Sequence, residues 1–194
     1  HVTVAGAVTS SEVSMMLGRD HVLPLSTVAL PGIDYVALGH VHKHQQLGAV
    51  PPVVYSGSLE RVDFSEERDV KGFCLVELDP RAPTGSRARW EFVPLAARPF
   101  VTINVEVRPD EEPTAAVLRE IARTHVVGAI VRVQVRLPEA LEGRLDERAA
   151  RQALGQAHSI AALTRDVARQ RRPRIGMETR GLTPEEALRR YLDQ

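Results

Sequence analysis

The sequence predicts an α/β protein with two consecutive domains and a C-terminal helical tail. Short apolar runs rich in β-branched residues punctuate the first half of the chain, and a clean alternation of apolar and polar residues starts at Phe100. Helical spacing appears between the alternating segments, which favours layered α/β packing. We place the first domain at residues 1–97, the second at 98–165, and a connector with a terminal helix at 166–194.

The first domain is predicted from short strands separated by turn residues. The expected strands are 1–6, 35–38, 53–55, 73–78 and 90–95. A turn-rich connection joins the last two as a hairpin. We also expect a short helical turn at 13–17 and a polar loop at 60–69.

The second domain is predicted from a change of periodicity. Residues 100–107 and 129–136 alternate, and each places valine or isoleucine on one face. A helix is expected to start at Pro113, and Asp146 is expected to cap a second one. With a third strand at 160–163, the order β-α-β-α-β predicts a small two-layer domain.

The polar face of this second sheet carries arginines. Arg132 and Arg136 alternate with the valines and are therefore expected to face away from the core. Such a row is typical of a solvated face, and it also suits contacts with DNA phosphates. The sequence leaves both interpretations open.

The C-terminal segment has the pattern of a helix start. Thr183 is the expected N-cap and Pro184 the first helical residue. The apolar stripe that follows consists of Leu188, Tyr191 and Leu192. Because a helix of about ten residues is marginal alone, we expect this stripe to pack against the rest of the chain or against a partner.

Composition excludes several classes of function. The formal net charge is zero, so no bulk attraction to nucleic acid is expected. Cys74 is the only cysteine, which excludes an intramolecular disulfide and favours a reducing compartment. No apolar run approaches the roughly 20 residues that cross a bilayer. We therefore expect a soluble cytoplasmic protein that is not inserted in a membrane.

The strongest functional signal is the segment 34–44, in which an apolar strand ends on Gly39 and histidines follow at every second position. Residues two apart in an extended chain point the same way. His40 and His42 are therefore expected to face one cavity beyond the carboxyl edge of a sheet, where open α/β sheets bind ligands. Neutral imidazole is a common metal ligand. The alternative is a pair of surface histidines in a polar loop.

A second candidate loop follows the expected strand 53–55. It has the sequence Ser56-Gly57-Ser58. Small residues at a strand end allow close backbone approach, which suits phosphate oxygens or a metal-bound water. Ordinary turn formation explains the same residues equally well.

These motifs together resemble a known family. Gly39-His-Val-His42 resembles the fifth motif of the calcineurin-like metallophosphoesterases. The segments that extend the resemblance, in this order, are His1-Val-Thr-Val-Ala-Gly6, Tyr55-Ser-Gly-Ser-Leu-Glu-Arg-Val-Asp-Phe64 and Lys71-Gly-Phe73. The chain thus resembles the C-terminal part of a metallophosphoesterase sandwich, followed by a capping domain and a helical tail, and the resemblance covers nearly its whole length.

The resemblance implies a two-metal nuclease that hydrolyses phosphodiesters, with Mn²⁺ usual and Mg²⁺ as the alternative. It implies that His1 and His40 bind one ion and that His42 binds the other, so that His40 and His42 are catalytic. The implied active-site loop residues are Gly39, Gly57 and Ser58. The role of His44 stays open, with a supporting or surface position favoured.

The resemblance also implies partners. Nuclease subunits of this family cut double-stranded DNA ends and hairpins in repair, recombination and replication, as a homodimer within a heterotetramer that contains an ATPase subunit. The capping domain would help to position DNA, with Arg132 and Arg136 as candidate contacts. The helix with Leu188, Tyr191 and Leu192 would bind the ATPase.

The sequence departs from the family in one large respect. The first three motifs, which supply metal-binding aspartates and an asparagine–histidine pair, are absent, and His1 begins inside a predicted strand. We therefore expect a fragment that does not cleave DNA by itself. Two alternatives are a non-catalytic DNA- and ATPase-binding module and a metallophosphoesterase that acts on small phosphoesters.

Overall fold

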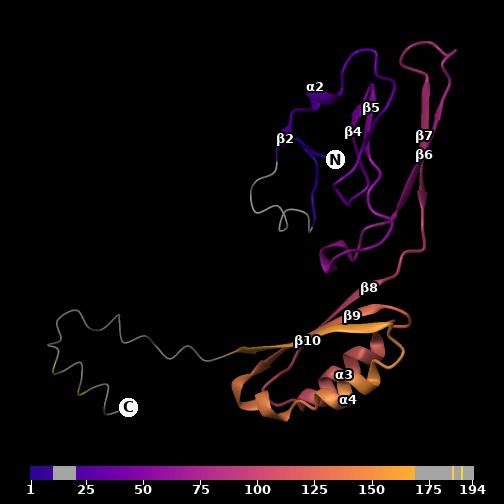
Figure 1. Ribbon diagram of the computed structural model, residues 1–194. Helices are drawn as coiled ribbons and strands as arrows, with labels where there is room; N and C mark the ends of the chain where they lie inside the picture. The colour runs from indigo at the N-terminus through magenta and orange to yellow at the C-terminus, as the bar shows by residue number, and fades with distance from the viewer. Residues whose placement is uncertain (11–20, 169–184, 186–188, 190–194) are drawn as a thin grey trace.

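A computed structural model describes residues 1–10, 21–168, 185 and 189 of the 194-residue chain (Figure 1). They form a mixed α/β structure with several small sheets, which confirms the predicted α/β class. The expected helical turn at 13–17 lies outside the described residues, as do Leu188, Tyr191 and Leu192 of the expected terminal helix. Glu185 and Arg189 are described, and both have helical backbone and are exposed.

We call the described residues before 98 the first lobe and those from 98 to 168 the second lobe. A three-stranded mixed sheet forms the centre of the first lobe. It consists of β3 (Val36–Leu38), β4 (Gln45–Ala49) and β5 (Pro52–Tyr55), with β5 in the middle. β3 runs parallel to β5, and β4 runs antiparallel to it. The expected strands at 35–38 and 53–55 are therefore confirmed. β4 was not predicted, because its polar residues show no strand periodicity and only pairing with β5 defines it.

Two further short strands lie beside this sheet. β1 (Thr3–Val4) pairs in parallel with β2 (Val22–Leu23), and the short helix α2 (Leu25–Val28) follows. The buried Tyr55 connects β1 to the central sheet, because its hydroxyl donates to the carbonyl of Val2 at 2.7 Å and accepts from the N–H of Val4 at 2.9 Å. This hydroxyl fixes the N-terminal residues, including His1, close to the end of β3.

The hairpin expected between residues 73 and 95 is confirmed. β6 (Gly72–Leu78) pairs antiparallel with β7 (Ala88–Pro94) along its whole length. The preceding polar segment was predicted as a loop, but it contains a single 3-10 turn, η1 (Phe64–Glu66), capped by the carboxylate of Asp63. This turn lies between the two lobes, next to β8 (Phe100–Glu106).

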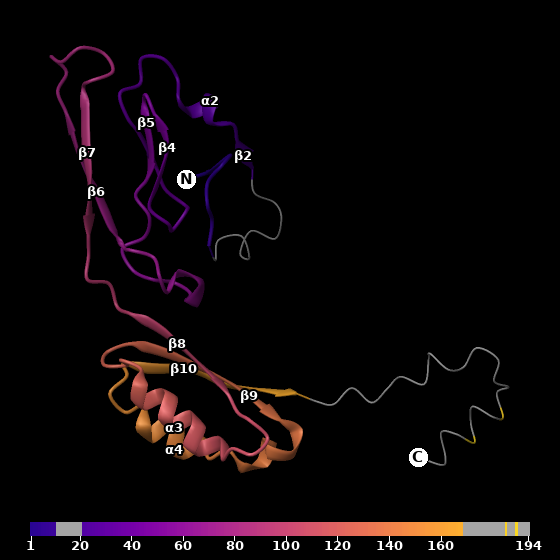
Figure 2. The same ribbon diagram turned by 180° about the vertical axis from the view of Figure 1, so that it is seen from behind.

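The second lobe has the predicted β-α-β-α-β order. β8, β9 (Ile130–Pro138) and β10 (Ser159–Ala168) form an all-parallel sheet with β9 in the centre. The helices α3 (Pro113–Arg123) and α4 (Glu147–Ala153) cover one face of it, as Figures 1 and 2 show from opposite sides. A 3-10 segment, η2 (Glu139–Arg144), leads from β9 towards α4. β10 continues past Arg165, where we had placed the end of this domain.

Both helices of the second lobe start where the sequence predicts, and Asp146 is the predicted cap of α4, whereas the cap of α3 by Glu112 was not predicted. Asp146 accepts a hydrogen bond from the N–H of Ala149 at 3.0 Å, and Glu112 caps α3 by accepting from Ala115. The bond from Ala115 is the largest cause that lowers the pKa of the exposed Glu112 carboxyl. Pro113 is the first helical residue, because a missing N–H is harmless there.

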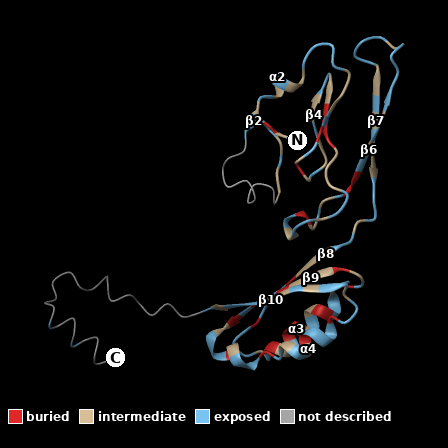
Figure 3. Cartoon of the chain, viewed as in Figure 1, coloured by how far each residue is buried: buried red, intermediate tan, exposed pale blue. Residues whose placement is uncertain are grey.

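Two separate cores support the two lobes. The alternating valines of β9 are fully buried between the sheet and its helices, and a smaller core in the first lobe gathers Val4, Leu38, Val41, Val53 and Tyr55. Figure 3 shows buried positions at these two places and a mixture of exposed and intermediate positions on the β6–β7 hairpin. No helix in the described part of the chain has the length and hydropathy needed to span a membrane.

Candidate functional site

The loop after β3 brings His40 next to His1. The Nδ1 atom of His40 lies 3.0 Å from Nε2 of His1, and the two rings are tilted by 58° with centroids 4.6 Å apart. His40 has a φ of 90°, a left-handed conformation that costs a non-glycine residue of the order of 1–3 kcal/mol. The expected extended alternation from His40 to His42 is therefore wrong at His40, because the chain turns there.

The spacing of the His1 and His40 nitrogens suits two kinds of contact. One ring nitrogen that carries a proton can donate to the other. Two nitrogens bound at right angles to one ion, each about 2.1 Å from it, also lie about 3.0 Å apart. The buried Val41 follows His40 and packs in the core of the first lobe, which holds the loop in place.

His42 has a different environment from the His1–His40 pair. Its Nδ1 atom lies 2.8 Å from Oε1 of Glu66 in η1. Its backbone carbonyl accepts from the N–H of Ser58 at 3.0 Å and from Nζ of Lys71 at 3.2 Å. His42 is thus fixed at both its ring and its backbone.

The buried ion pair behind His42 was not predicted. Nζ of Lys71 lies 2.8 Å from Oε2 of Glu66, and both side chains have no exposed surface. Asp69 is a more distant partner of the same ammonium, at 3.8 Å. A buried pair is tolerated only when further hydrogen bonds satisfy both groups. The sequence held one signal: Lys71 is one of only two lysines in a chain whose basic residues are otherwise arginine.

The loop after β5 approaches His42 closely. Gly57 has a φ of +82°, and a Cβ at this position would lie 2.8 Å from the N atom of His44 and 2.9 Å from the carbonyl oxygen of His42. Ser58 follows, and its hydroxyl donates to the carbonyl of Glu60 and accepts from Lys71. Gly39 is less constrained, because a Cβ there would lie 3.8 Å from Nδ1 of His1, which is an ordinary contact.

Replacement of Gly57 by alanine is expected to destabilise the fold by about 2 kcal/mol or more, because it adds a backbone clash to the 1–2 kcal/mol cost of a left-handed residue. Gly85→Ala is the matched control, because Gly85 has a φ of +88° with open space around it. Urea unfolding of both variants measures the difference. Equal losses of stability would contradict the close approach of Gly57 to His42.

His44 packs in an aromatic cluster and does not join the candidate site formed by the other histidines. Its ring is stacked on Phe92 with centroids 3.9 Å apart, and its Nδ1 donates to the carbonyl of Tyr55 at 2.9 Å. Burial and the nearby Cys74 thiol raise the pKa of Tyr35 to about 12. Burial also raises the pKa of Cys74, which keeps its thiol protonated and unreactive. This cluster joins the β6–β7 hairpin to the central sheet.

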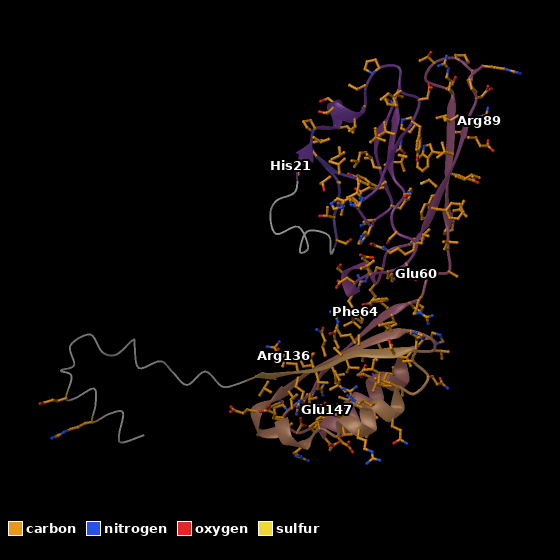
Figure 4. All side chains as sticks on the ribbon, viewed as in Figure 1. His21, Glu60, Phe64, Arg89, Arg136 and Glu147 are labelled. Atoms are coloured by element: carbon orange, nitrogen blue, oxygen red, sulfur yellow. The ribbon has the colours of Figure 1, made fainter. Side chains whose placement is uncertain are left out.

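The two predicted DNA-binding arginines have partners within the chain. The guanidinium of Arg132 lies 4.3 Å above the ring of Phe64 and donates to the hydroxyl of Thr102. Figure 4 shows Phe64 at the junction of the two lobes. Arg132 therefore helps to join η1 to the second sheet.

Arg136 lies on the exposed face of the second sheet. It lines an open hollow of about 550 Å³ and has Glu106 and Asp166 as its neighbours on the two adjacent strands. Its Nε atom lies 3.9 Å from Oδ2 of Asp166. The arginine thus stands between two carboxylates, and the face around it is not a basic patch.

The structure gathers the predicted site residues into a pair and a separate histidine. Within residues 1–10, 21–168, 185 and 189, no group of three or more His, Cys, Asp or Glu side chains is arranged to hold a metal ion. His1 and His40 contact each other, whereas His42 contacts Glu66. The sequence matches no family model.

Proposed function

We propose that this chain supplies the histidine half of a two-metal phosphodiesterase centre. The observation that carries the proposal is the 3.0 Å separation between Nε2 of His1 and Nδ1 of His40, which suits a shared divalent ion. This chemistry fits the calcineurin-like metallophosphoesterases. Within that class, the sequence motifs favour SbcD, the nuclease subunit of the bacterial SbcCD complex.

The proposed roles are those that the family resemblance implies, and the contact between His1 and His40 supports them in part. His1 and His40 would hold one ion, and His42 would bind the other. A pair of divalent ions supplies polarisation of the phosphodiester and activation of the attacking water. Gly39, Gly57 and Ser58 would shape the two loops that carry or contact the histidines.

The donor set fits such a centre only in part. Mn²⁺ and Mg²⁺ prefer oxygen ligands, whereas the His1–His40 pair offers imidazole nitrogens alone. Glu66 is the carboxylate next to His42, but it is buried and engaged by Lys71. We therefore propose that carboxylates other than Glu66 complete the metal centre around His1, His40 and His42. We also propose that the chain by itself does not cleave DNA.

The proposed substrates are double-stranded DNA ends and hairpins, and the proposed partner is the SbcC ATPase. The helix with Leu188, Tyr191 and Leu192 would contact SbcC, and the complex would act as a heterotetramer with two nuclease subunits in cytoplasmic DNA repair and recombination. Arg136 is the better candidate for DNA, because its side chain is 65% exposed, whereas Arg132 is half-buried and packs on Phe64.

A second candidate is a binding module without chemistry, which docks DNA and the ATPase. This candidate is favoured because the described residues contain no group of three or more His, Cys, Asp or Glu side chains that could hold a metal ion.

A hydrolysis assay on double-stranded DNA with Mn²⁺ separates the two candidates. We expect no cleavage by the chain alone, and cleavage when it is joined to a segment that carries the missing carboxylate motifs. In that longer protein, His40→Ala should lower the rate by more than the roughly 10–100-fold typical of outer-sphere partners, and the exposed His158→Ala should not. Unchanged cleavage in His40→Ala would contradict the proposal. If the longer protein does not cleave DNA, the binding module without chemistry is the remaining candidate.

A further inference from the structure

Glu66 lies where it can fix the imidazole of His42. Its Oε1 atom is 2.8 Å from Nδ1 of His42, and its Oε2 atom is 2.8 Å from Nζ of Lys71 and 3.1 Å from the N–H of Val62. The carboxylate is fully buried. Its position is therefore set by neighbours on both sides.

The donor in the contact between His42 and Glu66 follows from these neighbours. A carboxylate beside an ammonium group is ionised and only accepts hydrogen bonds. The proton between Glu66 and His42 must then belong to Nδ1. A neutral imidazole with its proton on Nδ1 carries its lone pair on Nε2.

We propose that Glu66 is a positioning residue that selects this tautomer and orientation of His42, so that Nε2 is the nitrogen presented for metal binding. The metal role of His42 rests on the proposed function, but the tautomer does not. Carboxylates that accept from the second nitrogen of a ligating histidine fix its orientation and raise its basicity in many metal sites.

Lys71 holds the carboxylate for this purpose. The three protons of its ammonium match three acceptors, which are Oε2 of Glu66 at 2.8 Å, the hydroxyl of Ser58 at 3.0 Å and the carbonyl of His42 at 3.2 Å. Lys71 thus contacts both the backbone of His42 and the carboxylate that fixes its ring. The arrangement makes the ring, the loop after β5 and η1 one connected unit.

The next residue offers a matched control. Glu67 follows Glu66 in the chain, but it is directed to the second lobe, where it accepts from the N–H of Thr102 at 3.1 Å and from its hydroxyl at 2.7 Å. A substitution of Glu67 changes the same charge in the same segment without touching His42. Glu67→Gln therefore separates the positioning role from a general effect on η1.

The test is ¹⁵N NMR of the histidine side chains in the metal-free 194-residue chain. We expect the proton of His42 on Nδ1 in the wild type and in Glu67→Gln, and a shift towards protonation of Nε2 in Glu66→Gln. Because Glu66→Gln leaves the buried Lys71 with only the more distant Asp69 as an anion, the double variant Glu66→Gln/Lys71→Met provides a folded alternative. Circular dichroism checks that each variant is folded.

A tautomer of His42 that is unchanged in the double variant would overturn the proposal, as would a wild-type proton on Nε2. Titration with Mn²⁺ gives a second readout, in which the double variant should weaken binding at His42 by about 10–100-fold. If the tautomer depends on Glu66 but neither His1 nor His40 responds to Mn²⁺, the positioning role stands and the proposed function fails.

Discussion

Lys71→Met is expected to lower the free energy of unfolding by about 3–5 kcal/mol, the typical cost of removing one partner from a buried ion pair. The substitution keeps the length of the side chain, but it leaves the carboxylate of Glu66 buried without its cation. It also removes a hydrogen bond to the carbonyl of His42. Urea unfolding followed by circular dichroism measures the loss.

The only other lysine provides the control. Lys43 is exposed, so Lys43→Met should change the stability by about 0.5 kcal/mol or less. The double variant Glu66→Gln/Lys71→Met should recover much of the loss, because no uncompensated charge then remains buried. A loss in Lys71→Met no larger than that in Lys43→Met would mean that the buried pair does not exist in solution.

Arg61→Ala is expected to destabilise the protein by at least about 2–3 kcal/mol, because hydrogen bonds that involve a charged group contribute more than neutral ones. The guanidinium donates to five backbone carbonyls in two segments, those of Glu66, Glu67 and Asp69 near η1 and those of Ala97 and Arg98 between the lobes. Its removal should therefore loosen the junction of the lobes. Thermal unfolding and hydrogen exchange at residues 95–99 measure both effects.

Two further substitutions make the Arg61 experiment specific. Arg61→Lys keeps the charge but loses the planar fork of donors, so it should remain close to Arg61→Ala in stability. The exposed Arg68→Ala should remain close to wild type. Full recovery of stability in Arg61→Lys would show that the charge matters and the bridging geometry does not.

The second lobe was predictable because its signals are local. Alternation at 100–107 and 129–136 reports one buried face of a strand, and Asp146 and Pro113 mark helix starts within a few residues of themselves. The structure confirms these elements. The extension of β10 to Ala168 was missed, because the polar residues 164–166 interrupt the apolar pattern and only pairing with β9 defines the strand from there on.

The sequence predicted which residue types form the candidate site, but not their backbone conformation or their contacts. The motif around His40 and His42 indicated metal chemistry, but the left-handed backbone of His40 cannot be deduced from spacing. The contact between His42 and Glu66 joins residues 24 positions apart, and a polar loop gave no reason to expect a buried carboxylate. Long-range pairing of this kind follows from the packing of η1 and not from any local pattern.

A Mn²⁺ titration of the chain followed by NMR tests the central claim most directly, because the paramagnetic ion broadens the signals of nuclei close to it. We expect the imidazole signals of His1 and His40 to broaden together, and His40→Ala to abolish the effect at His1. The exposed His158 should stay sharp over the same range. Broadening at His1 that persists in His40→Ala, or no broadening of the pair at any Mn²⁺ concentration that leaves His158 sharp, would contradict the account.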